Sequence, residues 1–565
     1  MTRPGEKGAI GKPRGPTIPV AVVYPNVYRV GMGNLGFQFL YHYLNAHPRF
    51  SAERFFYAHP RRIQKGYERG PLSEESHRTL RDFRLIAFSV PFENDYPAVP
   101  AALLAAGIPP FEKDRKPSDP LIIAGGVSVS VNPEPLAPFL DLVFIGELEE
   151  EGEEVGFFST LADILSSSSR RVVDRTGILD QFRGVPGVYV PSAYTFDFGK
   201  DGLIQAIRVK PGFPDRVTAV KRPSKEGPVP VSVLFSPEAE FGESLLVETN
   251  RGCGRGCRFC AAGWIHFPVR HAAFERFRQD VDGALEAGRT VGLIGSDLAG
   301  HPELEDILTS IVERGGKFSL SSIRPEGLSP RVIQLLARTG QKTATLAPEV
   351  ASPRLKRVIG KEIPSERFYE LVQKLVAAGI PNLRFYFMIG LPTETDDDIS
   401  TLVDFVLASR KIFLEASRPM KKIGKIGVQV NPFIPKPWTP FQWAPMALSG
   451  NLQKRVNIIQ AGLGKEPNLV VRVESIRQAA SQGVLSRGDR RVAKVLHQIA
   501  TQNTSAQGAF KNHHIDPAFY LYRERSFNEI FPWEVTDHGV SKKTLWRIFG
   551  KAMSEVSYDI STDQK

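Results

Sequence analysis

One pattern recurs between residues 245 and 431: six short apolar runs alternate with segments of helical periodicity, four of which end near a glycine. Continuous apolar runs separated by helices are typical of parallel strands in a sheet that helices cover. Six consecutive strand–helix units predict a partial (β/α)6 barrel of the TIM type. The predicted strands are residues 245–249, 290–295, 317–321, 342–347, 383–389 and 425–431.

Polar residues follow several of these predicted strands. Barrel enzymes place their active sites at the carboxyl ends of the strands, so these positions are candidates for a ligand site. An arginine there can hold a carboxylate through two parallel hydrogen bonds. Each residue alone is also typical of a solvated loop, and only their combination with the cysteine cluster described next favours a site. The candidates are Ser296, Asp297, Ser321, Ser322, Arg324, Glu349, Arg354 and Gly390.

The only three cysteines of the 565-residue chain, Cys253, Cys257 and Cys260, lie within eight residues after the first predicted strand. A disulfide would leave one thiol over. A structural zinc site takes four protein ligands, so His266 or His271 would have to complete it. Iron–sulfur clusters are held by cysteine thiolates, and three thiolates would leave one iron of a 4Fe–4S cluster open.

The spacing C-x3-C-x2-C, with Phe259 immediately before the third cysteine, resembles the motif of the radical S-adenosylmethionine (radical SAM) superfamily. The resemblance implies one 4Fe–4S cluster on Cys253, Cys257 and Cys260, whose open iron binds the amino and carboxylate groups of S-adenosylmethionine. It also implies reductive cleavage of that cofactor to a 5′-deoxyadenosyl radical. Electrons would come from a donor such as flavodoxin or ferredoxin.

In this superfamily, residues at the strand ends contact S-adenosylmethionine. Ser296 and Asp297 stand where these proteins often carry Gly-Gly-Glu, which engages the methionine amino group, so one of them would take that role. The chain has no further cysteine for a second cluster, which argues against a radical methylthiotransferase. The resemblance implies a cofactor site of Phe259, Ser296, Asp297, Ser321, Arg324, Glu349 and Gly390, and it assigns no catalytic residue.

A second set of apolar runs, at residues 18–24, 85–89, 121–126 and 140–146, alternates with helical segments such as 35–44 and 98–106. This pattern predicts a doubly wound parallel sheet, which binds ligands at the carboxyl ends of its strands. Gly125 and Gly126 at one such end favour either close approach of a ligand or a plain turn.

The order of these strands and glycines resembles the cobalamin-binding domain that many radical SAM proteins carry at their N-terminus. That family often has D-x-H-x-x-G after the first strand, and the matching positions here are Asn26, Tyr28 and Gly31. Tyr28 therefore occupies the position of the usual cobalt-ligating histidine. The resemblance implies that cobalamin binds without a protein histidine or does not bind.

The α/β chain is predicted to divide into five parts. We expect a flexible tail at 1–17, the cobalamin-binding-like domain at 18–150, a connecting subdomain at 151–240, the barrel at 241–445 and a mainly helical region at 446–565. Segments 386–395, 432–437 and 487–491 resemble an uncharacterised group of cobalamin-domain radical SAM proteins. No signal sequence or membrane-spanning run is found, and so few cysteines beside an oxygen-sensitive motif predict a cytoplasmic protein without a membrane partner.

The sequence favours a radical SAM enzyme with an unknown substrate, and cobalamin-dependent methylation is the natural reaction if cobalamin binds. Two alternatives remain. The net charge of +11 permits an RNA partner, and thus an RNA-binding modification factor, with Arg487, Arg490 and Arg491 either as phosphate contacts or as a solvated charged face. The other alternative is a non-catalytic iron–sulfur protein.

Overall fold

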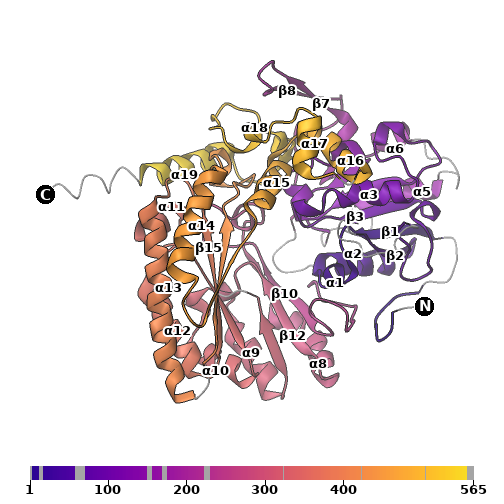
Figure 1. The fold of residues 1–565 in the computed structure, drawn as a ribbon. Coiled ribbons are helices and arrows are strands. Elements are labelled where there is room, and N and C mark those ends of the chain that lie inside the picture. Colours follow the sequence, from indigo (N-terminus) through magenta and orange to yellow (C-terminus); the bar gives the residue numbers. More distant parts are fainter. Residues whose placement is uncertain are drawn as a thin grey trace. The chain divides into compact units, whose positions relative to one another are not determined.

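The computed structural model shows two compact units, each with its own core (Figure 1). The first unit comprises residues 1–244, 484–520 and 528–539, and the second comprises 245–483, 521–527 and 540–565. The predicted region 446–565 thus contributes to both units, and the five-part division stays a prediction. No helix in the described part of the chain combines the length and apolarity needed to cross a membrane. The structure describes residues 3–11, 17–57, 70–148, 156–167, 175–221, 229–321, 324–420, 423–502 and 504–555.

The first unit is built on a six-stranded sheet in the order β2-β1-β3-β4-β5-β6. The first five strands are parallel, and β6 is antiparallel to β5. This confirms the predicted doubly wound class, and β2 is an additional strand at the edge. The strand order changes direction between β1 and β3, where such sheets bind ligands. The strands are β1 (Ile18–Tyr24), β2 (Phe50–Phe56), β3 (Leu85–Ser89), β4 (Leu121–Gly125), β5 (Leu142–Phe144) and β6 (Val188–Tyr189).

Helices follow these strands, and two short two-stranded sheets complete the unit's strands. The helices of the N-terminal part are α1 (Tyr28–Met32), α2 (Leu35–Ala46), α3 (Ala98–Ala105), α4 (Val127–Val131), α5 (Phe157–Ser167) and α6 (Arg175–Asp180). Later helices are α16 (Ala493–Gln502), α17 (Ala506–Asn512) and α18 (Pro517–Leu521), and α15 (Ile476–Arg487) contributes residues to both units. The remaining strands are β7 (Tyr194–Phe198), β8 (Ile204–Val209), β9 (Val217–Thr218) and β18 (Thr536–Asp537).

The second unit contains all six predicted barrel strands in their predicted order, hydrogen-bonded as two sheets. One sheet has the order β11-β10-β12-β13 and the other β14-β15-β16-β17. The seventh parallel strand, β17, was not predicted and extends the second sheet beyond the six-strand pattern. The strands are β10 (Leu245–Arg251), β11 (Arg270–His271), β12 (Thr290–Gly295), β13 (Lys317–Leu320), β14 (Thr343–Glu349), β15 (Asn382–Ile389), β16 (Ile426–Pro432) and β17 (Leu469–Val473).

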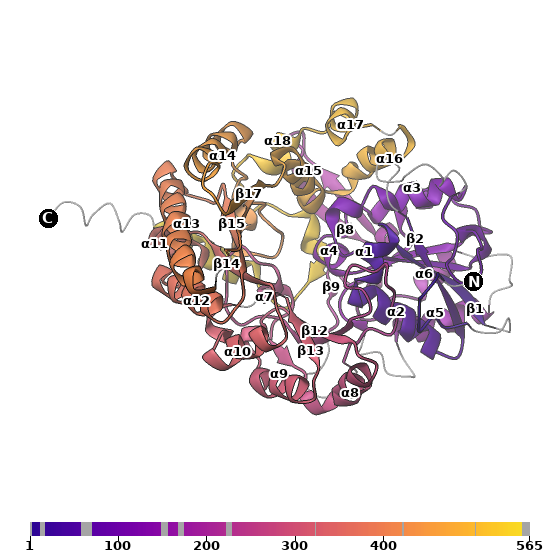
Figure 2. The ribbon, with the colours of Figure 1, turned by 60° about the horizontal axis from the view of Figure 1, so that its bottom comes forward.

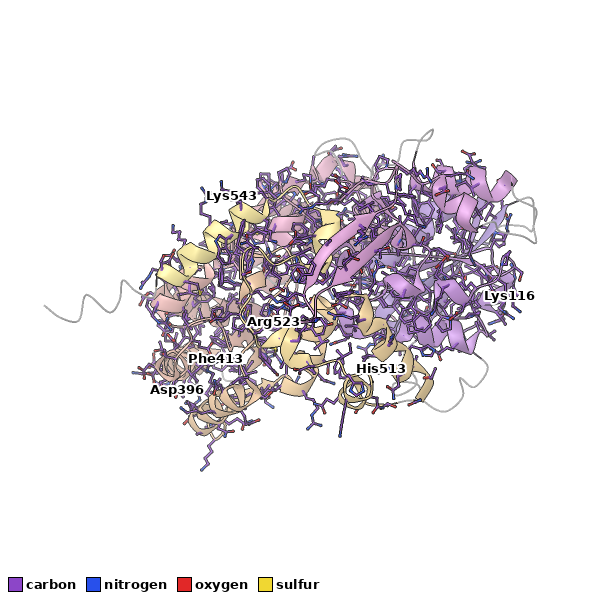
Figure 3. All side chains as sticks on the ribbon, turned by 90° about the horizontal axis from the view of Figure 1, so that it is seen from above. Lys116, Asp396, Phe413, His513, Arg523 and Lys543 are labelled. Carbon is purple, nitrogen blue, oxygen red and sulfur yellow. The ribbon has the colours of Figure 1, made fainter. Side chains whose placement is uncertain are left out.

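The helices of this unit are α7 (Ala262–Ile265), α8 (Arg278–Glu286), α9 (Leu304–Glu313), α10 (Pro330–Arg338), α11 (Pro353–Ile359), α12 (Ser365–Ala377), α13 (Asp396–Ser417), α14 (Ser449–Leu463) and α19 (Lys542–Ser554). Figure 2 shows α12, α13 and α14 on one side of the strands β14, β15 and β17. The long helix α13 begins at Asp396 and buries Phe413, both labelled in Figure 3.

Strand β15 shows how the sequence separates the two faces of its sheet. Side chains alternate between faces along a strand. Phe385 and Phe387 contact Phe405 of α13, with ring centroids 6.1 and 5.9 Å apart, and they belong to the core. Arg384 and Tyr386 alternate with them and therefore point away from the helices, toward the inner face of the barrel.

Candidate functional site

The three cysteines lie on the loop that follows β10, at the carboxyl edge of the barrel strands. Two glycines shape this loop. Gly252 has φ of 80°, and a Cβ built on it would lie 2.4 Å from the carbonyl oxygen of His266. Gly256 has φ of 69°, a conformation that residues with a side chain rarely adopt. The loop can therefore take this path only with glycine at Gly252. All three thiols are free and partly buried.

Backbone donors surround two of the sulfurs. Burial raises the pKa of the Cys253 thiol, and a hydrogen bond from the backbone of Arg255 acts in the opposite direction. Burial likewise raises the pKa of Cys260, against hydrogen bonds from the backbone of Ala262 and Gly263. Such N–H groups stabilise a thiolate and are among the features that tune iron–sulfur sites. The donor set and its surroundings therefore fit a thiolate-bound cluster.

Arg324 places a positive charge beside the cysteine loop. Its Nη1 lies 3.5 Å from the sulfur of Cys257, and its Nε is buried with no hydrogen-bond partner. Arg324 was predicted to line the cofactor site, and the structure places it against one of the predicted cluster ligands.

The zinc alternative finds no support in the described residues. Among them, no group of three or more His, Cys, Asp or Glu side chains is arranged to hold a single metal ion. The ring of His271 packs edge-on against His301, with centroids 5.1 Å apart. An iron–sulfur cluster distributes its thiolates over several irons, so it does not require them around one point.

Arg258, which the sequence analysis missed, anchors the cysteine loop to the end of α11. Its backbone N–H donates to Ile359, and its Nη1 donates to the carbonyls of Arg357 at 2.8 Å and Val358 at 3.0 Å. A buried guanidinium there satisfies the last carbonyls of a helix and complements its negative end. Its Nη2 also forms an ion pair with Glu555 at 3.1 Å. The sequence offered no signal for this role, because the partners lie about 100 and 300 residues away.

Asp297 lies in the loop after β12 and faces the cysteine loop. Its Oδ2 accepts from Arg255 Nε at 2.9 Å, while its Oδ1 is buried without a partner. Asn250, at the end of β10, likewise has a buried Oδ1 without a partner. Two unsatisfied buried acceptors are costly unless a ligand donates to them. Ser296 is exposed beside them.

A cavity of about 620 Å³ lies at the carboxyl ends of the barrel strands. Its lining includes Phe259, Ser321 and Glu349, so the structure brings three of the predicted cofactor residues to one space. Phe259 also packs against a buried apolar cluster that includes Phe433. Ser322 lies outside the described residues. A cavity of this volume is typical of small-molecule sites.

Glu349 adopts a left-handed backbone conformation, with φ of 67°, at the end of β14. Such a conformation is strained for a residue with a side chain and tends to occur at functional sites. Its carboxylate forms an ion pair with the buried Lys361 at 3.0 Å, and Lys361 also donates to the carbonyl of Ala347. Lys361 was not predicted, and nothing in the sequence near Glu349 pointed to it.

Gly390 is buried after β15 with φ of 85°, and a Cβ there would meet Leu452 at 2.6 Å. Its N–H donates to Glu394 Oε1 at 2.8 Å, so this donor is already used within the loop. Burial raises the pKa of Glu394 to about 7, against the opposing effect of Arg455 at 2.9 Å. The structure does not bring Gly390 into the lining of the 620 Å³ cavity. Arg354 pairs with Asp398 rather than facing that cavity.

Tyr28, which follows β1 at the point where the strand order of the first unit changes direction, is held by contacts with Glu6 and Arg3. Its hydroxyl donates to Glu6 at 2.5 Å, and the guanidinium of Arg3 lies 3.8 Å from its ring centroid. Burial, together with that hydrogen bond, raises its pKa. Tyr28 therefore does not fit as a metal ligand. Asn26 is similarly engaged, donating to Asp95 at 2.8 Å.

The same edge of the first unit exposes an apolar surface. Val27, Val30, Phe92 and Val127 follow β1, β3 and β4, and each is between 38% and 42% exposed. Apolar side chains gathered at a ligand-binding edge are more informative than isolated ones elsewhere on a surface. Gly126 lies beside them with φ of 111°, and a Cβ on it would meet the Val90 carbonyl oxygen at 2.7 Å. Glycine at this position therefore allows the backbone to pack closely against Val90.

The three arginines considered as phosphate contacts are structural instead. Arg487 is buried, Arg490 binds the buried carboxylate of Glu134 at 2.7 Å, and Arg491 pairs with Asp489 at 2.7 Å. Both predictions for this segment, phosphate contact and solvated face, are therefore wrong. The charge of Arg490 is paired over a long distance in sequence, which a local charge pattern does not reveal, whereas Arg491 pairs with a carboxylate two residues away.

Comparison with known proteins gives two family matches. Residues 36–191 match the family described as radical SAM proteins, N-terminal, and residues 247–406 match the radical SAM superfamily. An uncharacterized protein of Methanocaldococcus jannaschii is 27% identical over 481 residues, which cover 84% of this chain and 90% of that protein. The ribosomal protein uS12 methylthiotransferase RimO of Thermodesulfovibrio yellowstonii is 24% identical over 190 residues, which cover 31% of this chain and 44% of that protein.

Among solved structures, the radical S-adenosylmethionine methyltransferase TsrM from Kitasatospora setae, with cobalamin and a [4Fe-4S] cluster bound, aligns with a TM-score of 0.49 and 12% identity. The alignment covers 88% of this chain and 99% of that one. The cysteine motif lies within the second family match, at the carboxyl edge of the barrel that this match spans. The chain belongs to the radical SAM superfamily.

Proposed function

We propose that the protein is a radical SAM enzyme in which Cys253, Cys257 and Cys260 hold one 4Fe–4S cluster beside bound S-adenosylmethionine. The observation that carries the proposal is the placement of three free thiols on a glycine-shaped loop whose Phe259 lines a 620 Å³ cavity. When bound and reduced, the cluster supplies the electron that cleaves S-adenosylmethionine to methionine and a 5′-deoxyadenosyl radical.

The protein's own residues would position S-adenosylmethionine and balance the charge of the cysteine ligands. Arg324 offsets the negative charge of the thiolates at Cys257. The unpartnered Oδ1 of Asp297 can accept from the methionine ammonium, while Arg255 holds the other oxygen in place. Glu349 can accept from ribose hydroxyls at the cavity wall, with Lys361 balancing its charge. The apolar side of the cavity, formed in part by Phe259 and Phe433, limits water near the reacting groups.

A second proposal concerns cobalamin, and the exposed apolar edge of the first unit supports it. Tyr28 cannot serve as a lower ligand while it bonds to Glu6, so cobalamin would bind by apolar contact alone, across Val27, Val30, Phe92 and Val127. Methylation of a carbon atom in an unknown substrate is then the proposed reaction.

The first proposal is tested by anaerobic reconstitution of the wild type and Cys257→Ala with iron and sulfide. The wild type is expected to bind about four irons and to form 5′-deoxyadenosine after reduction. The Cys257→Ala protein should bind less iron and form no 5′-deoxyadenosine. A wild-type protein that binds a cluster but never cleaves S-adenosylmethionine would instead be a non-catalytic iron–sulfur protein.

Cobalamin is tested separately by the visible spectrum of desalted protein after incubation with hydroxocobalamin. Val127→Asp should weaken binding about tenfold, because a carboxylate then replaces an apolar contact. Leu448→Asp, at another exposed apolar position, in the second unit, is the control. Absence of bound cobalamin from the wild type would contradict the cobalamin proposal and would not affect the proposal of a 4Fe–4S cluster with S-adenosylmethionine.

A further inference from the structure

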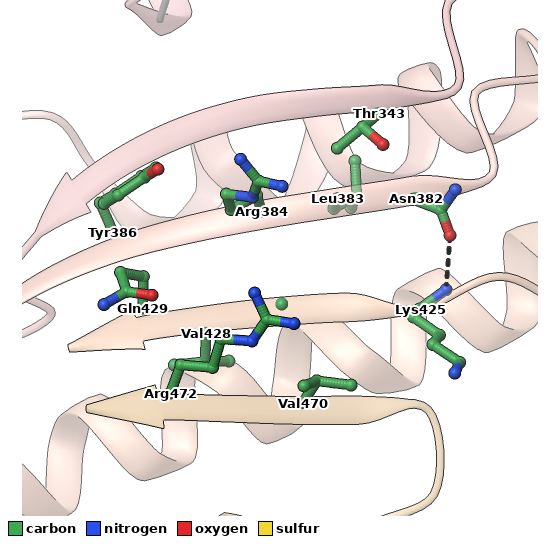
Figure 4. A pocket seen from close by; sticks show the side chains of 11 residues that line it. Thr343, Asn382, Leu383, Arg384, Tyr386, Lys425, Val428, Gln429, Val470 and Arg472 are labelled. Carbon is green, nitrogen blue, oxygen red and sulfur yellow. Dashed lines mark hydrogen bonds between the residues drawn. The ribbon is translucent and has the colours of Figure 1, made fainter. Parts of the chain in front are cut away.

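A second cavity, of about 410 Å³, lies on the inner face of the sheet formed by β14 to β17 (Figure 4). Its lining extends from the beginnings of β14, β15 and β16 to the middle of β15 and β16, whereas the cysteines lie beyond the carboxyl end of β10. Its lining includes three basic side chains, Arg384, Lys425 and Arg472, and no Asp or Glu. An excess of positive charge in a concave space lowers the free energy of a bound anion.

The protein's own carboxylates do not pair with these two arginines within the described residues. Arg384 and Arg472 are exposed, and neither forms an ion pair within the described residues. Elsewhere in this unit arginines of the barrel loops are paired, as Arg255 is with Asp297 and Arg354 with Asp398. Arg384 and Arg472 therefore keep their planar donor groups available, and such groups bind carboxylate or phosphate through paired hydrogen bonds.

The register of the sheet allows both guanidinium groups to reach one ligand. Tyr386 pairs with Gln429, and Gln429 pairs with Arg472, so these three side chains share one level of the inner face. Arg384 lies two residues before Tyr386. Neighbouring strands are about 4.8 Å apart and residues rise about 3.3 Å, so the two arginine Cα atoms are roughly 12 Å apart, within the combined reach of their side chains.

The space between the arginines depends on Gly427. Gly427 pairs with Arg384 in the sheet and has no side chain to fill the level between β15 and β17. A Cβ built on it would lie 3.9 Å from Cγ of Arg384, so alanine would fit while a larger side chain would enter the cavity. Figure 4 shows Arg384 and Arg472 on the same face as Tyr386 and Gln429, whose polar ends can add hydrogen bonds.

Tyr386 lines both cavities, so the arginine-lined space borders the space beside Phe259. Along β15, Arg384 precedes Met388, which lines the larger cavity, by four residues or about 13 Å. A molecule held at one end by the arginines can thus extend past Tyr386 to the region where the proposed radical forms.

We propose that Arg384 and Arg472 bind the phosphate or carboxylate group of a small-molecule substrate, whose reacting carbon lies roughly 10–13 Å from that group. The reacting end of this inference rests on the proposed function; the anion site does not. A small molecule is favoured over RNA because a volume of 410 Å³ lies in the range of small-molecule sites.

The test is calorimetric titration of the full chain with phenyl phosphate and, separately, phenylacetate, in buffer that contains physiological salt. Phenol is the uncharged control ligand. The wild type should bind at least one of the two anions and not phenol, and the Arg384→Gln/Arg472→Gln double variant should bind it about tenfold or more weakly. Arg338→Gln, at an exposed arginine in the last turn of α10, is the matched control and should bind as the wild type does.

The preference between the two anions distinguishes a phosphorylated from a carboxylated substrate. Equal binding by the wild type and the double variant, or no binding of either anion, would overturn the inference. Binding of tRNA that disappears in the double variant, with no binding of either small anion, would overturn it in favour of a nucleic-acid substrate.

Two readouts separate this inference from the proposed function. The Cys257→Ala protein should bind the anion with wild-type affinity, and the double arginine variant should still cleave S-adenosylmethionine without substrate. If no variant or wild-type sample forms 5′-deoxyadenosine while the anion still binds through the arginines, the radical function fails and the anion site stands.

Discussion

At the scale of single residues, the path of the cysteine loop depends on one glycine. Gly252 combines φ of 80° with a Cβ position only 2.4 Å from the carbonyl oxygen of His266. Alanine at this position cannot be accommodated unless the backbone moves, because both the conformation and the contact oppose it. The loop that carries Cys253, Cys257 and Cys260 begins directly after this residue.

We expect Gly252→Ala to lower iron content after reconstitution to well below half of the wild-type value, with an unchanged far-ultraviolet circular dichroism spectrum. Gly254→Ala is a matched control in the same loop, since a Cβ there meets no atom within 4 Å. Equal iron content in the two alanine variants would show that the observed loop path does not matter for the cluster.

At the scale of elements, the loop between β15 and α13 contains a carboxyl group whose proton uptake is coupled to folding. Burial raises the pKa of Glu394 from 4.5 to about 7, although Arg455 and the N–H groups of Gly390 and Leu391 oppose this shift. Between these two values the folded protein holds a proton that the unfolded chain releases. The free energy of unfolding therefore falls as pH rises from about 4.5 to about 7, and this contribution is constant above that range.

Glu394→Gln removes this titration. Relative to Glu394→Gln, the wild type should lose up to about 3 kcal/mol of unfolding free energy as pH rises across that range. Urea unfolding at a series of pH values measures it. A difference that is independent of pH from 4.5 to 8 would contradict the assigned cause.

Elements with strong local patterns were predictable from the sequence. The apolar runs of β10, β12 and β15 mark parallel strands, and the polar residues that follow them indicate the carboxyl edge. Strand β17 was not predicted, although four of its five residues are apolar. It lies at the edge of the sheet, and none of its residues is fully buried.

The partners of site residues were not predictable in the same way. Ser321 and Glu349 were identified by position after a strand and Phe259 by its place in the cysteine motif, and all three line one cavity. Lys361 and Arg258 were missed, because their importance comes from contacts that tertiary folding alone creates. Charge patterns misled for Arg490, whose partner Glu134 is 356 residues away in the sequence.

At the scale of the whole molecule, the end of the chain completes the core of the barrel unit. After residue 483 the chain contributes to the first unit, and its last described segment, with α19, returns to the second. There Trp546 packs against Trp443 with ring centroids 5.1 Å apart, and Phe549 adds a second aromatic contact. Glu555 at the end of α19 pairs with Arg258 of the cysteine loop.

The loop that carries the cysteines is therefore stabilised by residues almost 300 positions later. We expect Trp546→Ala to lower the free energy of unfolding of the barrel unit by about 2 kcal/mol, since a partly buried indole is lost. Urea unfolding followed by circular dichroism measures this change, and iron retention during unfolding reports the cysteine loop. Lys543→Ala, on the exposed side of α19, is the control.

Because each unit has its own core, this loss should be confined to one of two unfolding transitions, and the iron should be released in that transition. An unchanged barrel transition in Trp546→Ala, or release of iron with the other transition, would contradict the role of α19 in supporting the cysteine loop.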